Sequence, residues 1–300
     1  PLSGAAFRVG REAAAEFGED IQPEQADRHT MGMSCLIQAR ETDRPQPFVA
    51  PEWANKYAGK DALPKRSMEL PSTNFWWIEL GGDMDSIRDT EIVRDELLKA
   101  ALGVWDYIKN RSGQPVENWA LDWVGFLPGK RESRRYEGDV IVTQNDVRAE
   151  GKFEDLVAYG GWSMDDHHPG GLRWAGKPTI FHKAPSPWGI PYRALYSRNI
   201  DNLWFAGRNL SATHAALSSS RVMATCAILG QAVGEAAAIA VRESLSPREV
   251  YEKRIGELRQ ALMDADCYLP WARRAIPELT RNARLSASSG DPEPLRNGLD

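Results

Sequence analysis

The sequence predicts an α/β protein: an α+β portion with several short strands, then one strand, a glycine turn and a long apolar helix. Three observations lead to this prediction. Over the first 190 residues, short apolar and aromatic runs alternate with segments of helical periodicity. Residues 202–241, NLWFAGRNLSATHAALSSSRVMATCAILGQAVGEAAAIAV, are mostly apolar and contain no proline. The chain has 300 residues, enough for one large or two smaller domains.

Composition and charge argue against some classes of protein. The formal net charge is −5 and the pI is about 5.7, so we predict no nucleic-acid partner, which would need a basic face. The three cysteines are widely spaced and form no CxxC pair, which favours neither a disulfide framework nor a metal site. The chain has no start methionine and no signal peptide and opens in a well-patterned stretch, so we expect it to be the middle of something longer.

The first half of the chain predicts two helices and two strands. Residues 8–19 are expected to form a charged helix, and residues 30–37 are expected to form a strand. Four prolines mark residues 40–65 as irregular. Residues 74–80 form an aromatic strand closed by two glycines, and residues 89–110 follow helical spacing.

The second half is richer in loops. Residues 120–126 and 139–143 are predicted strands, and residues 160–171, GGWSMDDHHPGG, have the composition of a polar loop. An α-helical pair is expected over residues 247–261. Beyond Ser286 the composition is that of a linker or tail.

Residues 202–241 carry the clearest local geometry. A buried strand at 203–206 ends at Gly207, a polar loop covers 208–219, and a helix over 220–241 follows, capped by Ser218, Ser219 or Ser220. A helix N-terminus aimed at a glycine turn binds anions or an electron-rich ring edge. The helix is long enough to span a membrane, but it contains Thr225, Gln231 and Glu235 and much alanine. We therefore predict no membrane span; a plain core helix is the other alternative.

The string IDNLWFAGRNLSATHAALSSSRVMATCAILGQAVGEAAA closely resembles the carboxyl-terminal flavin-binding segment of the FAD-dependent oxidoreductase family with the glutathione-reductase-like fold. FRVGREA, MGMS, NFWWIELGG, GVWDYIKN, LDWVGFLPGKRESRRYEGD and GGWSMDDHHP resemble landmarks of the same family in the same order. The resemblance implies FAD as the cofactor and a small molecule as the substrate.

The resemblance also implies a division of the chain. Members with this arrangement begin with a strand–GxGxxG–helix that holds the ADP half of FAD, and no such motif is found here. We expect a truncated chain with a substrate-binding (cap) domain at 1–190 and the C-terminal part of a Rossmann-like FAD domain at 191–245. A helical segment at 246–285 and a linker or tail at 286–300 complete it.

The resemblance places the cofactor on the glycine turn and on the start of the helix. Gly207 and the amides after it are expected to approach the pyrophosphate or the ribityl chain. The expected cofactor contacts are Gly207, Arg208, Asn209, Ser211, Ser220, Arg221, Val222 and Met223. Arg221 opposes the helix dipole in the first turn, so we expect it to have a specific partner.

Two histidine-containing stretches are candidates for proton chemistry. His214 is expected nearest the flavin ring, as a hydrogen-bond donor or general base, although it can equally satisfy a loop carbonyl. Residues 165–168, DDHH, suit acid/base work with His168 as a catalytic residue and Asp166 and His167 binding substrate. Metal binding and a solvated polar loop are the alternatives; four consecutive side chains cannot all converge on one ion.

The basic run KRESRR at 130–135 is the third candidate. Such a run is usually a solvated face. Because it matches a family landmark, we expect Arg131 to bind substrate and Arg134 to act at the flavin, where arginine compensates a reduced, anionic ring. Trp162 is expected to wall the substrate pocket.

The predicted function is hydride transfer between flavin and a small polar substrate, such as a sugar or a hydroxy acid, with His214 or His168 removing the proton. A glycoside hydrolase or lyase using Asp165 and Asp166 is one alternative, although neighbouring carboxylates fit poorly with that chemistry. A binding fragment without flavin is the other. The sequence leaves the oligomeric state, the compartment and the electron acceptor open.

Overall fold

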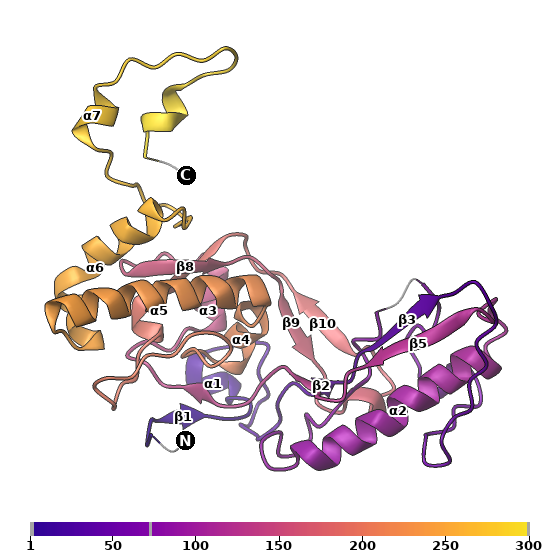
Figure 1. The fold of residues 1–300 in the computed structure, drawn as a ribbon. Coiled ribbons are helices and arrows are strands. Elements are labelled where there is room, and N and C mark those ends of the chain that lie inside the picture. The colour runs from indigo at the N-terminus through magenta and orange to yellow at the C-terminus, as the bar shows by residue number, and fades with distance from the viewer. Residues whose placement is uncertain (1–2, 72–73, 299–300) are drawn as a thin grey trace.

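The computed structural model describes residues 3–71 and 74–298, which form two lobes (Figure 1). The larger lobe contains α4, α5 and α6, and the smaller lobe contains α2 with the β3–β5 pair. The two-stranded sheet of β9 and β10 lies between the lobes, and the C-terminal segment with α7 extends away from the larger one (Figure 1). The fold thus mixes helices with small sheets, as an α/β assignment requires.

The smaller lobe is organised by helix α2 (Thr90–Asn110). Its buried positions include Val93, Leu97 and Val104, which share one side at helical spacing. They pack in one core with residues of β3 (Ile37–Glu41) and β5 (Trp119–Val124), which pair antiparallel.

The larger lobe is built on two long helices. Helix α5 (Met223–Glu243) packs on α6 (Pro247–Asp264) and on β8 (Leu156–Gly160), which pairs with β11 (Trp188–Pro191). A separate core, extending from Val142 to Leu269 with Met31 added, lies beneath these helices. The two cores therefore draw on different parts of the chain.

The remaining elements are short. In chain order they are β1 (Phe7–Arg8), α1 (Ala14–Phe17), β2 (Met33–Ser34), β4 (Glu79–Leu80), β6 (Gly129–Lys130), β7 (Arg135–Tyr136), α3 (Gln144–Arg148), β9 (Met164–His167), β10 (Thr179–His182), α4 (His214–Ser220) and α7 (Glu278–Arg281). Strand β2 pairs with both β4 and β6, β1 pairs with β7, and β9 pairs with β10. All these pairs are antiparallel.

Strand β9 positions the site because successive side chains of a strand point to opposite faces. Asp165 and His167 share one face, and His167 contacts Glu79 of β4. Asp166 occupies the other face and contacts His214 of α4. Strand β9 therefore directs Asp165 with His167 to one face and Asp166 to the opposite face.

Several sequence predictions are confirmed. The helix predicted over 89–110 is α2, which begins one residue later, and the strand predicted over 120–126 is β5, shifted by one or two residues. Of the region predicted to be irregular, residues 40–65, residues 42–59 contain no helix or strand, whereas β3 extends to Glu41 and a short 3-10 helix covers Lys60–Ala62. The helical pair expected over 247–261 is instead one helix, α6, which Ser246 and Glu249 begin with a capping box.

The start of the long apolar helix was predicted wrongly. The serines expected to cap it form the last turn of α4, and α5 begins at Met223 after a break at residues 221–222. Its N-cap is Val222, which has no side-chain oxygen to accept a bond from the first turn. Thr213 caps α4 instead by accepting from the Ala216 N–H.

Other predicted elements are shorter than expected. The helix over 8–19 is reduced to α1, because Gly10 has φ +90° before it and Gly18 ends it in the left-handed region. The strand over 203–206 is only an isolated bridge between Trp204 and Tyr196, and the strand over 139–143 only a bridge at Val142. Within residues 30–37, only β2 and Ile37, the first residue of β3, pair as strand. Within residues 74–80, only β4 does.

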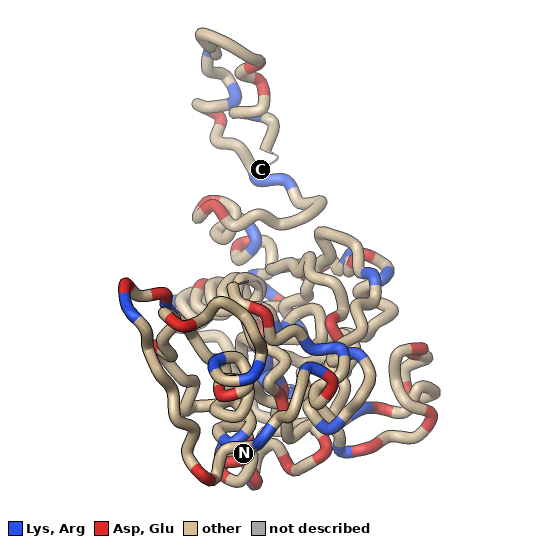
Figure 2. The backbone as a smooth tube through the Cα atoms, turned by 90° about the vertical axis from the view of Figure 1, so that its right-hand side faces the viewer, with Lys and Arg blue, Asp and Glu red and all other residues tan. Residues whose placement is uncertain are grey.

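Helix α5 is, by length and composition, apolar enough to cross a membrane, with a mean hydropathy of 1.5. One such helix establishes no membrane span, because core helices pass the same test. Its buried face packs on β8 and α6, whereas Gly230 and Gly234 face open space. In the view of Figure 2, Lys and Arg positions alternate with Asp and Glu positions, so that face is not uniformly basic.

Candidate functional site

A cavity of about 390 Å³ lies where the glycine turn meets the start of α5. Its walls are formed by Ser133, Arg134, Ala206, Gly207, Arg208, Asn209, Arg221, Met223 and Cys226. Five of the eight residues predicted to contact the cofactor line it together with Arg134, and its volume is within the ~300–1,000 Å³ typical of small-molecule sites.

The cavity is strongly cationic. Arg134, Arg208 and Arg221 line it, and Lys130 is close enough that burial first, and then Arg208 and Arg134, lower the pKa of its ammonium group. In the described part of the chain, Arg134 and Arg208 have no carboxylate partner. Cations held together without counter-charges favour an anionic ligand.

The backbone adds to this preference for anions. The first turn of α5 has no side-chain cap, so its N–H groups at the edge of the cavity are available to a ligand. Gly207 has φ +98°, a conformation that residues with a Cβ rarely adopt, and the space beside it is open. A helix start without a side-chain cap beside a glycine turn is an arrangement that binds phosphates in other proteins.

Glu132, His214 and Asp166 form a buried network in the larger lobe. His214 Nδ1 lies 2.8 Å from Glu132 Oε2, and His214 Nε2 lies 3.2 Å from Asp166 Oδ1. Burial alone would lower the pKa of His214, but the two carboxylates outweigh it and raise the pKa to about 10. The ring is therefore an imidazolium at neutral pH. Glu132 also contacts Arg135, which is buried and paired with Glu12 at 2.8 Å.

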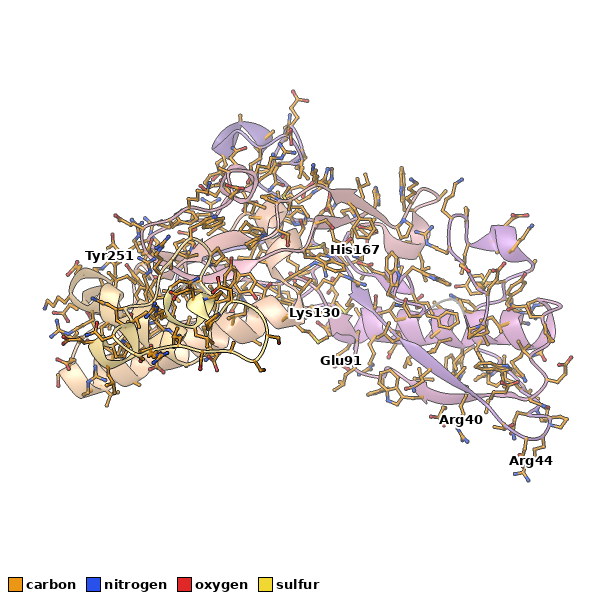
Figure 3. The ribbon with its side chains drawn as sticks, turned by 90° about the horizontal axis from the view of Figure 1, so that it is seen from above. Arg40, Arg44, Glu91, Lys130, His167 and Tyr251 are labelled. Atoms are coloured by element: carbon orange, nitrogen blue, oxygen red, sulfur yellow. The ribbon has the colours of Figure 1, made fainter. Side chains whose placement is uncertain are left out.

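Glu79, His167 and Asp165 form a second network on the opposite face of β9. His167 Nδ1 lies 2.6 Å from Glu79 Oε2, and His167 Nε2 lies 3.2 Å from Asp165 Oδ2. Arg131 lies 3.3 Å from Glu79, and Arg221 Nη2 donates to Asp165 Oδ2 at 2.9 Å. In Figure 3, His167 is labelled in the middle of the molecule, between the two lobes.

Arg221 connects the second network to the cavity. Its guanidinium bonds both the side chain and the carbonyl of Asp165, and it also lines the cavity. Burial opposes ionisation of Asp165, but the bonds from His167 and Thr179 and the charge of Arg221 prevail and lower its pKa to about 2. Arg221 was expected to have a specific partner, and that partner is Asp165.

Asp165 and Asp166 do not converge. Each bonds a different histidine on a different face of β9, so they offer no facing pair of carboxylates to a glycosidic bond. In residues 3–71 and 74–298, no group of three or more His, Cys, Asp or Glu side chains is arranged to hold a metal ion.

His168 differs from the two networked histidines. Its ring stacks on Trp174 with centroids 4.1 Å apart, and its Nδ1 accepts from the Gly170 N–H at 3.1 Å. Burial, and next the charge of Arg11, lower the pKa of His168, so the ring is neutral at pH 7 with its proton on Nε2. His168 therefore presents an N–H donor.

The other residues predicted to bind the cofactor or the substrate do not line this cavity. Ser211 and Ser220 are buried, and Val222 is the N-cap of α5. Arg131 donates to Ser34 Oγ at 2.8 Å as well as facing Glu79. Trp162 is half exposed, and its carbonyl accepts from Ser219 Oγ.

Sequence reasoning missed the two glutamates on which the histidine networks depend. Glu79 is the only charged residue in the apolar run FWWIEL, and Glu132 is the only acid in a basic run. An acid in an apolar strand must be paired when it is buried, so Glu79 was detectable in principle. Its partner was not, because His167 lies 88 residues away in the sequence.

With its arginines, a glycine turn and an uncapped helix N-terminus, the cavity has the chemistry of a site for an anionic ligand. The chain belongs to the FAD dependent oxidoreductase family, whose family model matches residues 1–262. No curated protein and no solved structure matches the chain. The protein therefore depends on FAD and has a general flavin oxidoreductase role.

The residues around the cavity fit this cofactor. The Nε atoms of Arg134 and Arg221 are buried and lack a hydrogen-bond partner among the described residues. Phosphate oxygens and flavin carbonyls are acceptors only, so they match an arginine donor that would otherwise stay unpaired. Arg208 and the N–H groups at the start of α5 would hold the same anionic groups.

Proposed function

We propose that this cavity binds the phosphates or the flavin edge of FAD and that the protein oxidises a small hydroxylated substrate by hydride transfer. The observation that supports this most is the meeting of Gly207, Arg134, Arg208 and the uncapped start of α5 around one cavity. FAD, when bound, supplies the two-electron acceptor for such a reaction.

The residues around the cavity would stabilise charge. Arg134 and Arg208 have no competing carboxylate among the described residues, so their positive charge is available to the ligand. Arg221 is partly neutralised by Asp165, which fixes the position of its guanidinium. Fixed cations and N–H dipoles favour developing negative charge because they need no reorganisation.

His168 and Asp166 are the groups we propose for orienting the substrate hydroxyl. His168 offers an Nε2–H donor, and Asp166 offers Oδ2, which has no partner in the part of the chain that is described. The His214 imidazolium keeps Asp166 ionised, because burial first would raise the pKa of Asp166 and His214 lowers it below the ordinary value. His214 then stabilises charge rather than accepting a proton, since both of its nitrogens face carboxylates.

Met223→Glu tests the cofactor site. Met223 is 89% exposed and lines the cavity, so a carboxylate there adds negative charge beside the expected phosphates and favours the helix dipole. We expect FAD affinity, measured by quenching of flavin fluorescence, to fall at least about tenfold while the fold is retained. Val241→Glu is the matched control, because Val241 is exposed at the other end of the same helix.

If Met223→Glu binds FAD as tightly as wild type does, the cavity is not part of the FAD-binding site. Oxidation of hydroxylated compounds, followed as bleaching of flavin absorbance under anaerobic conditions, tests the reaction itself. If flavin is bound but no hydroxylated compound bleaches it, the proposed substrate class is wrong.

A further inference from the structure

A second cleft follows the cofactor cavity. One cavity of about 370 Å³ is lined by Phe7, Val9, Arg28, Asp85, Ile87, Arg88 and Arg134, and another of about 270 Å³ by Val9, Arg28, His29, Asp83, Met84, Asp85 and Ser86. They share Val9, Arg28 and Asp85, so they form one cleft. Arg134 lines both this cleft and the cofactor cavity, which places the two spaces on either side of one guanidinium.

The cleft has an excess of unpaired positive charge. Arg28, Arg88 and Arg134 line it, and within the described ranges no carboxylate lies at ion-pair distance from any of them. Arg134 stacks over the Phe7 ring, with Cζ 5.3 Å from the centroid, which holds the guanidinium without neutralising it. The guanidiniums of Arg28 and Arg88 are therefore available to one ligand of the cleft, and Arg134 lies between this cleft and the cofactor cavity.

The carboxylates of the cleft are already engaged. Asp85 Oδ1 accepts from the backbone N–H groups of Ile87 and Arg88 at 3.0 and 3.1 Å. Asp83 lies 3.3 Å from Arg173. Their bonds leave the arginines as the groups with free hydrogen-bonding capacity.

Ser86 supplies an independent indication of a ligand. Its side chain is 3% exposed, it lines the cleft, and its Oγ has no hydrogen-bond partner among the described residues. A buried hydroxyl without a partner costs about 1–3 kcal/mol, so such groups in native proteins are normally satisfied by a ligand or by water.

We propose that this cleft binds the carboxylate of the substrate, with Arg28 and Arg88 holding the charge and Ser86 bonding a polar group of the same molecule. The substrate class is then a small hydroxylated carboxylic acid rather than a neutral sugar. Guanidinium groups bind carboxylates through two parallel hydrogen bonds, which fixes orientation as well as charge. The assignment of this ligand as the substrate rests on the proposed function. Arg134 lies between the ligand in this cleft and the cofactor cavity.

The test compares malate with its uncharged diamide, malamide, by isothermal titration calorimetry. Wild-type protein is expected to bind malate and not malamide. The double variant Arg28→Gln/Arg88→Gln is expected to lose at least about tenfold in malate affinity, since hydrogen bonds to charged groups contribute about 1.5–3 kcal/mol each. Arg40→Gln is the control, because Arg40 lies in the smaller lobe, between Glu91 and Arg44 in Figure 3, and pairs with Asp122. Ser86→Ala is expected to weaken malate binding severalfold and covers the case in which the double variant does not fold.

Binding of FAD is measured on the same proteins and is expected to be unchanged in the double variant. Equal affinity for malate and malamide, or malate affinity unaltered by either variant, would overturn the proposal. A tenfold loss of FAD affinity with malate binding retained would assign the arginines to the cofactor phosphates and would also overturn it. Because calorimetry reads malate binding without flavin, failure here is distinguishable from failure of the wild type to bind FAD.

Discussion

The two histidine networks on the faces of β9 have the same components in different surroundings. In each, a histidine lies between a buried glutamate at Nδ1 and an aspartate at Nε2. The Glu132–His214–Asp166 network is backed by Arg135, of which 1% of the side chain is exposed. The Glu79–His167–Asp165 network is backed by Arg221, which reaches the cofactor cavity. Similar chemistry thus stabilises the core on one face and is connected to the site on the other.

Glu132→Gln has the largest expected effect. The variant leaves the His214 imidazolium and Arg135 with less counter-charge in the core, and removing one partner of a buried ion pair costs about 3–5 kcal/mol. Glu79→Gln should cost about half as much, because Arg131 keeps its bonds to Ser34 and to the Trp76 carbonyl. Urea unfolding of both variants measures the difference. Equal losses would mean that the networks do not differ in their contribution to stability.

The pH dependence of stability separates the networks next. The pKa of His214 is raised from 6.5 to about 10, so its contribution is complete below pH 6.5 and declines as the pH rises toward 10. We expect wild type to lose about 2 kcal/mol more than His214→Gln between pH 7 and pH 9, at ~1.4 kcal/mol per pH unit for one proton. Urea midpoints at several pH values measure this. Parallel curves for the two proteins would show that His214 does not titrate in this window.

Asp165→Asn tests the link between the second network and the cavity. The substitution removes the counter-charge of Arg221, so we expect a loss of about 1 kcal/mol in unfolding free energy, because Asp165 is partly exposed to solvent. The cavity becomes more positive, and inorganic pyrophosphate should bind about threefold more tightly. Asp122→Asn, on the surface pair with Arg40, is the control and should leave pyrophosphate binding unchanged.

Thr179→Val has the smallest expected effect. Thr179 Oγ1 donates to Asp165 Oδ1, and losing this bond should cost about 0.5–1 kcal/mol. The variant also removes one of the bonds that lower the pKa of Asp165, so that pKa should rise from about 2 toward 3.8. Titration of the carboxyl carbon by NMR measures the shift, and an unchanged value would show that the hydroxyl does not contribute to it.

The sequence predicted those features that depend on neighbouring residues. Helix α2 follows from apolar spacing, whereas the grouping of Gly207, Arg208 and Met223 was expected from the resemblance of their segment to a flavin-binding segment. The break between α4 and α5 was placed wrongly because serines are favoured as helix N-caps, whereas here Ser218 and Ser219 lie in the last turn of α4 and donate to the carbonyls of Ala215 and Trp162.

The networks themselves depend on contacts between distant parts of the chain. Glu132 and His214 are 82 residues apart, and neither residue type reveals its partner. The direction of the two aspartates, by contrast, was predictable from strand geometry, although the sequence indicated a loop there. The division into domains at residues 190 and 245, and the roles of the individual site residues, stay predictions.

The divergence of Asp165 and Asp166 has a consequence for how this gene segment can vary. The side chains of a strand alternate, so deleting or inserting one residue within β9 would exchange the faces of the two aspartates and separate them from His214 and Arg221. Length changes are therefore tolerated in the loops on either side of β9, whereas within the four residues of the strand itself we expect substitutions only.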